Sequence, residues 1–177
     1  RQRQMCIRDR DTSVPIWAIF EVLTLGEFGN FYSCLSYGVR REVSIKLGFH
    51  QPSDSDAFLT KKIIFAIKEL RNAVAHNDVI FDTRFSRSSI DKSLSSSLEI
   101  VTGIKSITFK SITDYIILVV YLLKCFGVPK GDMRRFVAEF QDNIETLRKQ
   151  IPTSLFARIV LTDTRPKLKS LQEYIRK

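Results

Sequence analysis

Apolar residues recur at helical spacing along most of the chain, and this pattern predicts a series of helices. In the clearest stretch the apolar positions follow the spacing i, i+4, i+7, i+8, i+11 and i+15. These positions are Leu59, Ile63, Ala66, Ile67, Leu70 and Val74, whereas Lys61, Lys62, Lys68 and Glu69 lie off the stripe. We therefore expect one long amphipathic helix that begins at Asp54 or Ser55 and ends at about His76.

Weaker apolar patterns predict further helices on both sides of this stretch. Before it, we expect one helix from Val14, a second that ends near Gly38 and a third over residues 39–47, with Gly26 and Gly29 interrupting after the first. After it, we expect an exposed serine-rich connection over 86–97 with a short helix after Ile90, a β-favouring piece over 104–109, and helices over 112–126, 132–151, 154–160 and from 166 onward. No internal repeat is visible. The pattern predicts an all-α bundle.

Length and composition fit one globular domain. The chain has 177 residues, of which 44% are apolar and 27% charged, and this excludes collagen-like, disordered and coiled-coil classes. The longest apolar run, residues 115–123, is far shorter than the roughly 18 residues of a membrane span, so a buried helix is expected there. The sequence shows no signal peptide, and we expect a cytoplasmic protein without a membrane association.

The basic charge is concentrated at the two ends. The net charge is +9, but residues 1–10 hold four Arg and one Asp, and residues 165–177 hold five basic residues and one Glu. Because residues 1–10 lack any apolar periodicity, we interpret them as a non-native or artefactual segment and expect a single domain over 11–177. A basic C-terminal tail can attract polyanions without sequence preference.

One segment carries residues suited to phosphodiester chemistry. His50 stands in a loop between Gly48 and Pro52, whereas Asn72 and His76 lie at i, i+4 near the end of the long predicted helix, with Arg71 beside them. A histidine with a pKa near 6.5 exchanges protons at neutral pH, and an arginine can hold two phosphate oxygens. Arg84 and Arg87 follow the helix and are candidates for phosphate contact.

The same spacing also occurs at an ordinary helix end. There Arg71 would be solvated and His76 would interact with the last carbonyl groups, and spacing alone favours this interpretation. No metal site is expected, because no second ligand stands at metal-binding spacing and the three cysteines, Cys6, Cys34 and Cys125, lie far apart. No cofactor is expected either.

Three segments resemble the Abi-like (abortive infection, AbiD/AbiF) family of bacterial phage-defence proteins, and the last of them resembles the Arg-polar-x-x-x-His motif of the HEPN superfamily. They are Trp17-Ala-Ile-Phe-Glu21, Leu25-Gly-Glu-Phe-Gly-Asn-Phe-Tyr32, and Leu70-Arg-Asn with His76, followed by Arg84 and Phe85. The resemblance spans about residues 14–130 and lacks the N-terminal part of such proteins, so we expect a fragment.

The resemblance implies a HEPN-like helical bundle that forms a homodimer and cleaves RNA without a metal. It implies that Arg71 and His76 are the catalytic pair, with Asn72 supporting them, in a toxin-like effector of antiphage defence. An RNA or protein antitoxin would then be a further partner. The alternative is a catalytically silent helical module for RNA binding or oligomerisation. By the same resemblance Trp17 is recognisable, but we expect it in the core.

Overall fold

The described residues form a series of helices. The computed structural model describes residues 15–49, 54–76, 85 and 90–177. Its helices are α2 (Ile16–Phe20), α3 (Leu25–Cys34), α4 (Tyr37–Lys46), α5 (Leu59–Ala75), α6 (Lys92–Thr102), α7 (Ile112–Cys125), α8 (Lys130–Gln150), α9 (Thr153–Ile159) and α10 (Thr164–Arg176). No strand occurs within these residues, and the predicted all-α class is confirmed. No described helix is both long and apolar enough to cross a membrane.

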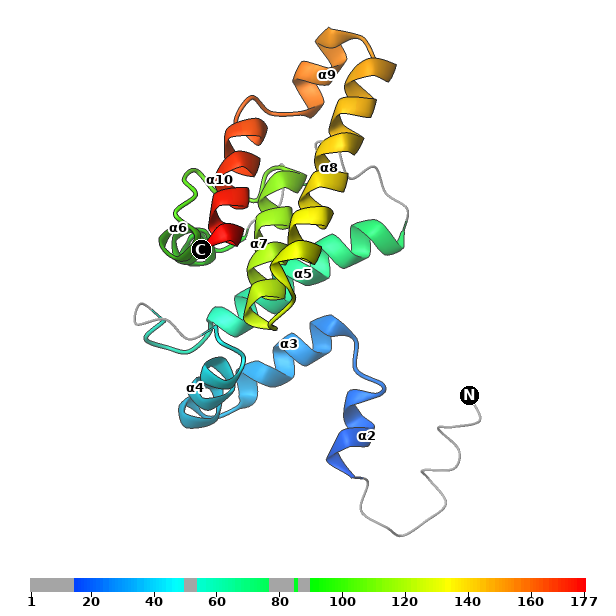
Figure 1. The fold of residues 1–177 in the computed structure, drawn as a ribbon. Helices are drawn as coiled ribbons and strands as arrows, with labels where there is room; N and C mark the ends of the chain where they lie inside the picture. Colours follow the sequence, from blue (N-terminus) through cyan, green and yellow to red (C-terminus); the bar gives the residue numbers. More distant parts are fainter. Residues whose placement is uncertain (1–14, 50–53, 77–84, 86–89) are drawn as a thin grey trace.

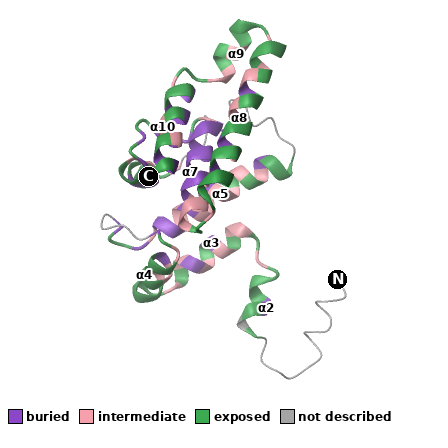
Figure 2. Cartoon of the chain, in the orientation of Figure 1, coloured by how far each residue is buried: buried purple, intermediate pink, exposed green. Residues whose placement is uncertain are grey.

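Helix α7 lies at the centre of the C-terminal part of the bundle. It packs against α5, α6, α8 and α10, and α5 in turn carries α3 on its other side (Figure 1). Helix α5 therefore connects the N-terminal helices to the C-terminal bundle. Figure 2 shows α7 as the most buried helix and α2 as mainly exposed.

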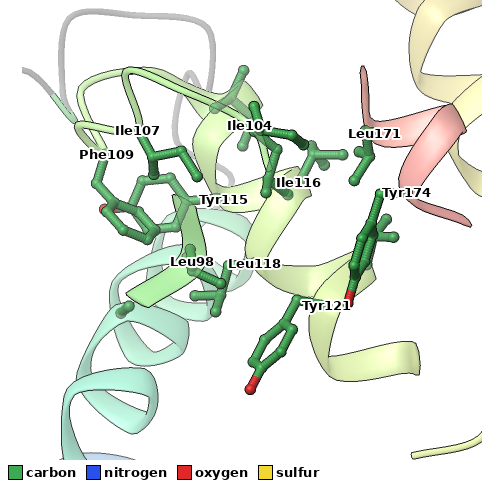
Figure 3. Close-up of a cluster of buried hydrophobic side chains, with 14 of the residues drawn as sticks. Leu98, Ile104, Ile107, Phe109, Tyr115, Ile116, Leu118, Tyr121, Leu171 and Tyr174 are labelled. Atoms are coloured by element: carbon green, nitrogen blue, oxygen red, sulfur yellow. The ribbon is translucent and has the colours of Figure 1, made fainter. Parts of the chain in front are cut away.

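The hydrophobic core is built around α7. Residues 112–118 of this helix are all buried, as the long apolar run predicts. Side chains from α6, α10 and the segment before α7 close over it, including Leu98, Ile104, Phe109, Leu171 and Tyr174 (Figure 3). Burial of apolar area on this scale is the main force that holds the helices together.

A buried ion pair connects helix α10 to helix α7. Lys167 Nζ donates to Asp114 Oδ1 at 2.7 Å and lies 2.8 Å from Asp163 Oδ2. The other Asp114 oxygen accepts hydrogen bonds from the backbone N–H groups of Thr108 and Phe109. One carboxylate thus connects two helices and the segment that precedes α7.

The prediction that Gly26 and Gly29 interrupt the helical pattern is wrong. Both lie inside α3, which begins with a capping box between Thr24 and Glu27. A Cβ atom at Gly29 would stand 2.8 Å from the Phe65 ring, and one at Gly26 would stand 3.4 Å from Lys68 Cδ. The two glycines allow α3 to lie close against α5.

The β-favouring piece over 104–109 is not a strand. Ser106 and Phe109 have positive φ angles, which a strand excludes. The backbone N–H groups of Ile107 and Phe109 bond to the side chains of Glu99 and Asp114 instead of a neighbouring strand. The Ile and Phe side chains that suggested a strand are buried in the core.

The helix expected after Ile90 is confirmed as α6, which includes the serines at 93 and 95–97. Two further expectations need correction at particular residues. Helix α5 begins at Leu59, since the Asp54 carboxylate accepts the N–H groups of Phe58 and Leu59. Trp17 is 60% exposed and lies outside the core, whereas the Phe20 ring of the same helix packs against Phe28 and Phe31 of α3. Residues 1–10 and His50 lie outside the described residues.

Candidate functional site

Arg71, Asn72 and His76, here called the motif residues, occupy the C-terminal end of α5. Arg71 and Asn72 lie in its last turns, and His76 is the residue that caps the helix. Arg71 and His76 are exposed and Asn72 is half-buried. The structure thus places all three at one helix end that faces solvent, as the i, i+4 spacing predicts.

The opposite side of α5 fixes the position of this helix end. Leu59, Ile63, Ala66 and Ala73 are buried in the bundle. Ala73 is completely buried although its neighbour Asn72 carries the motif. A small core residue therefore anchors the backbone of the helix directly beside Asn72.

Asn72 connects the other two motif residues. Its side-chain oxygen accepts a hydrogen bond from an Arg71 guanidinium nitrogen at 3.1 Å, and its carbonyl accepts the His76 N–H at 3.0 Å. The amide orients the guanidinium, while the helical bond holds the backbone of His76. The supporting role of Asn72 in catalysis stays a prediction.

This arrangement can bind and protonate a phosphodiester. The Arg71 guanidinium is charged at all physiological pH values and can face a phosphate with its remaining N–H groups. The His76 imidazole is open to solvent on the same helix end and can exchange a proton with a substrate oxygen.

Two expected RNA-binding residues, Arg84 and Arg87, lie outside the described residues. Between the two arginines, Phe85 is buried, and its ring centre lies 4.5 Å from that of Tyr115. The chain after the motif therefore returns to the core at α7.

Within the described part of the chain, no group of three or more His, Cys, Asp or Glu side chains could hold a metal ion. Cys34 is exposed and Cys125 half-buried, and both are free thiols. Burial raises the pKa of the Cys125 thiol, which makes it a weak nucleophile.

A further set of side chains lies on the same helix as the motif residues. Phe58, Lys61, Phe65, Lys68 and Asn72 succeed one another at alternating steps of three and four residues. That spacing places them on one face of a helix, which was a detectable signal.

Comparison with known proteins gives one match. Residues 2–82 match the family model of Abi-like proteins, a little under half of the chain. The matched range contains α2 to α5 and therefore all three motif residues. No curated protein and no solved structure matches the chain. The match supports the Abi-like resemblance over this part of the chain.

Proposed function

From the premise that the chain is Abi-like over residues 2–82, we propose that it is a metal-independent endoribonuclease of the HEPN type. It acts as a toxin-like effector of bacterial antiphage defence. The observation that carries the proposal is that Arg71, Asn72 and His76 share one end of a helix whose other side is buried, with Arg71 and His76 exposed to solvent.

The proposed reaction is an internal transfer at phosphorus. The RNA 2′-hydroxyl attacks the adjacent phosphorus, the bond from phosphorus to the 5′-oxygen breaks, and a 2′,3′-cyclic phosphate forms. Arg71 binds the phosphate and stabilises the charge that develops on its oxygens. His76 takes the proton of the 2′-hydroxyl or gives one to the 5′-oxygen. DNA lacks the attacking hydroxyl and is not a substrate.

Two copies of α5 facing each other across a two-fold axis would complete the site. Such a homodimer would supply two His76 side chains to one cleft, so that one could act as the base and the other as the acid. This arrangement rests on the HEPN resemblance. An RNA or protein antitoxin would restrain the enzyme in the cytoplasm, where its RNA targets lie.

The test is cleavage of total bacterial RNA in EDTA. We expect the wild type to cleave and both Arg71→Ala and His76→Ala to lose about 10²-fold or more of the rate. Arg71→Lys should retain a part, because it keeps the charge but loses the bidentate geometry. Arg134→Ala, an exposed arginine on α8, is the matched control. Mapping of the 3′ ends should reveal the cyclic phosphate.

Full activity of Arg71→Ala would refute the assignment. Absence of cleavage by a folded wild type would favour the alternative, a silent helical module for RNA binding or oligomerisation. Two basic side chains of the terminal helix are less available to such a module, because Arg165 pairs with Glu145 at 2.6 Å and Lys167 is buried in its ion pair. Growth during expression separates the two functions, since an active ribonuclease slows growth and its His76→Ala variant does not.

A further inference from the structure

A row of basic and aromatic side chains runs along α5 toward the motif residues. Lys61, Phe65 and Lys68, here called the cationic ridge, lie on the same helix face as Asn72. This face is separate from the one that Leu59, Ile63 and Ala66 bury in the core.

Aromatic rings hold the two lysines of the ridge in place. The Lys61 ammonium lies 5.8 Å from the centre of the Phe65 ring and 5.5 Å from that of Phe58, and the Lys68 ammonium lies 4.9 Å from the Phe65 ring centre. These distances are within the range of cation–π attraction. A ring face orients an ammonium group without neutralising its charge.

Helix α3 forms the wall behind the ridge. Gly29 lies against the Phe65 ring and Gly26 against the aliphatic stem of Lys68. Since neither glycine carries a side chain, the ring and the stem are packed directly on the α3 backbone. The two ammonium groups are therefore presented from a supported surface.

The ridge has more positive charge than its carboxylates neutralise. Two ammonium groups converge on one ring, and among the described residues only Glu69 makes an ion pair with either of them, at 3.5 Å from Lys68. Lys62, one residue from Lys61, differs: it lies 3.5 Å from the Asp91 carboxylate and donates to Ser93 at 2.7 Å. Two neighbouring cations that repel each other favour the binding of an anion between or beside them.

The ridge is continuous with the motif residues. Lys68 stands one turn before Arg71 and Asn72, and about 16 Å of helix axis separates Lys61 from Asn72. The phosphate groups of a nucleic-acid strand follow one another at a regular spacing, so several of them can lie along the stretch from Lys61 to Asn72. An acidic protein segment would present carboxylates without that regular spacing.

We propose that the cationic ridge binds consecutive phosphates of a single RNA strand and guides that strand to Arg71 and His76. The proposal rests on the proposed function for the identity of the strand as the substrate. The ridge contributes to affinity and leaves the chemical step to the motif residues. A single strand is favoured because its backbone can follow a helix face and present its 2′-hydroxyl to the site.

The direct test is RNA binding in a His76→Ala background, so that the probe stays intact. The probe is a short fluorescent oligouridylate, titrated at several salt concentrations in EDTA. We expect the Lys61→Gln/Lys68→Gln variant to raise the Kd roughly tenfold and to lower the slope of log affinity against log salt by about 0.7 per lysine removed. Lys62→Gln, the matched control on the same helix, should change neither, and Lys61→Arg/Lys68→Arg should restore both.

If the double variant, with its fold verified by circular dichroism, has an unchanged Kd and an unchanged salt slope, the proposal that the ridge binds RNA is wrong. Equal binding of polyglutamate and the oligouridylate would overturn it as well. Cleavage assays with His76 present test the ribonuclease function apart from the ridge. In them the Lys61→Gln/Lys68→Gln variant should have a higher KM than the wild type and the same kcat. If cleavage requires Arg71 and His76 but the double variant leaves KM unaltered, the proposed role of the ridge is wrong and the ribonuclease function stands. If the ridge lysines are needed for RNA binding but no cleavage occurs, the ribonuclease function is wrong and the role of the ridge in binding stands.

Discussion

The sequence predicts the positions of some residues of this protein well and those of others not at all. The motif residues share one end of a helix because of their spacing, and the structure adds the bond from Arg71 to Asn72. Lys167 lies at the other extreme. It belongs to a segment that was read as a basic tail, yet it is 4% exposed and bonded to Asp114. Sequence gave no sign of this, because the two residues are 53 positions apart.

Removal of this lysine tests the importance of the buried pair. We expect Lys167→Met to lower the free energy of unfolding by about 3 kcal/mol, because Asp114 would keep a buried charge without its cationic partner. Urea denaturation monitored by circular dichroism measures the change. Lys169→Met, an exposed lysine on the same helix, should stay within about 0.5 kcal/mol of the wild type. Equal stability of the two variants would mean that backbone N–H groups alone stabilise the Asp114 carboxylate.

Among the elements, most helices were predicted from local periodicity. The expected helices over 112–126, 132–151 and 154–160 correspond closely to α7, α8 and α9. Periodicity failed at Gly26 and Gly29, where helix propensity predicts a break but a close contact with α5 favours a helix. It failed again at 104–109, where apolar residues enter the core from an irregular segment.

The contact between α3 and α5 can be tested with two glycines. We expect Gly29→Ala to lower the free energy of unfolding by roughly 1–3 kcal/mol, since its Cβ would meet the Phe65 ring at 2.8 Å. Gly38, in the first turn of α4, has no atom within 4 Å of an added Cβ. Gly38→Ala should therefore stabilise the protein by about 0.5–1 kcal/mol through the helix preference of alanine. Thermal and urea unfolding of both variants measure the difference, and a neutral Gly29→Ala would show that the ring moves aside easily.

At the scale of the whole molecule, the free energy of unfolding should decrease at alkaline pH. Burial raises the pKa of Tyr174 to about 12, compared with about 10 in an unfolded chain. Burial opposes the charge of Lys167, but its hydrogen bonds to Asp114 and Asp163 outweigh this effect, so its pKa is also raised. Both groups hold their protons more tightly when folded. Their contribution is complete below about pH 10 and is lost as the pH rises through the folded pKa values.

The corresponding experiment compares Tyr174→Phe with the wild type. We expect the free energy of unfolding of the wild type to fall between about pH 10 and about pH 12, and that of Tyr174→Phe to fall less steeply, because phenylalanine has no proton to lose. Tyr37→Phe, on the exposed surface of α4, controls for removal of a hydroxyl. Identical slopes for Tyr174→Phe and the wild type would contradict the assignment.

The sequence by itself determined the helical class, the long α5 and the Abi-like motif residues, since these depend on the order and spacing of neighbouring residues. Tertiary structure alone decided that α3 packs through its glycines, that Trp17 stays exposed, and that Lys167 is buried against Asp114. It also decided that Lys61 and Lys68 converge on one ring. Contacts between residues far apart in the chain depend on how whole helices pack, and local periodicity carries no information about that packing.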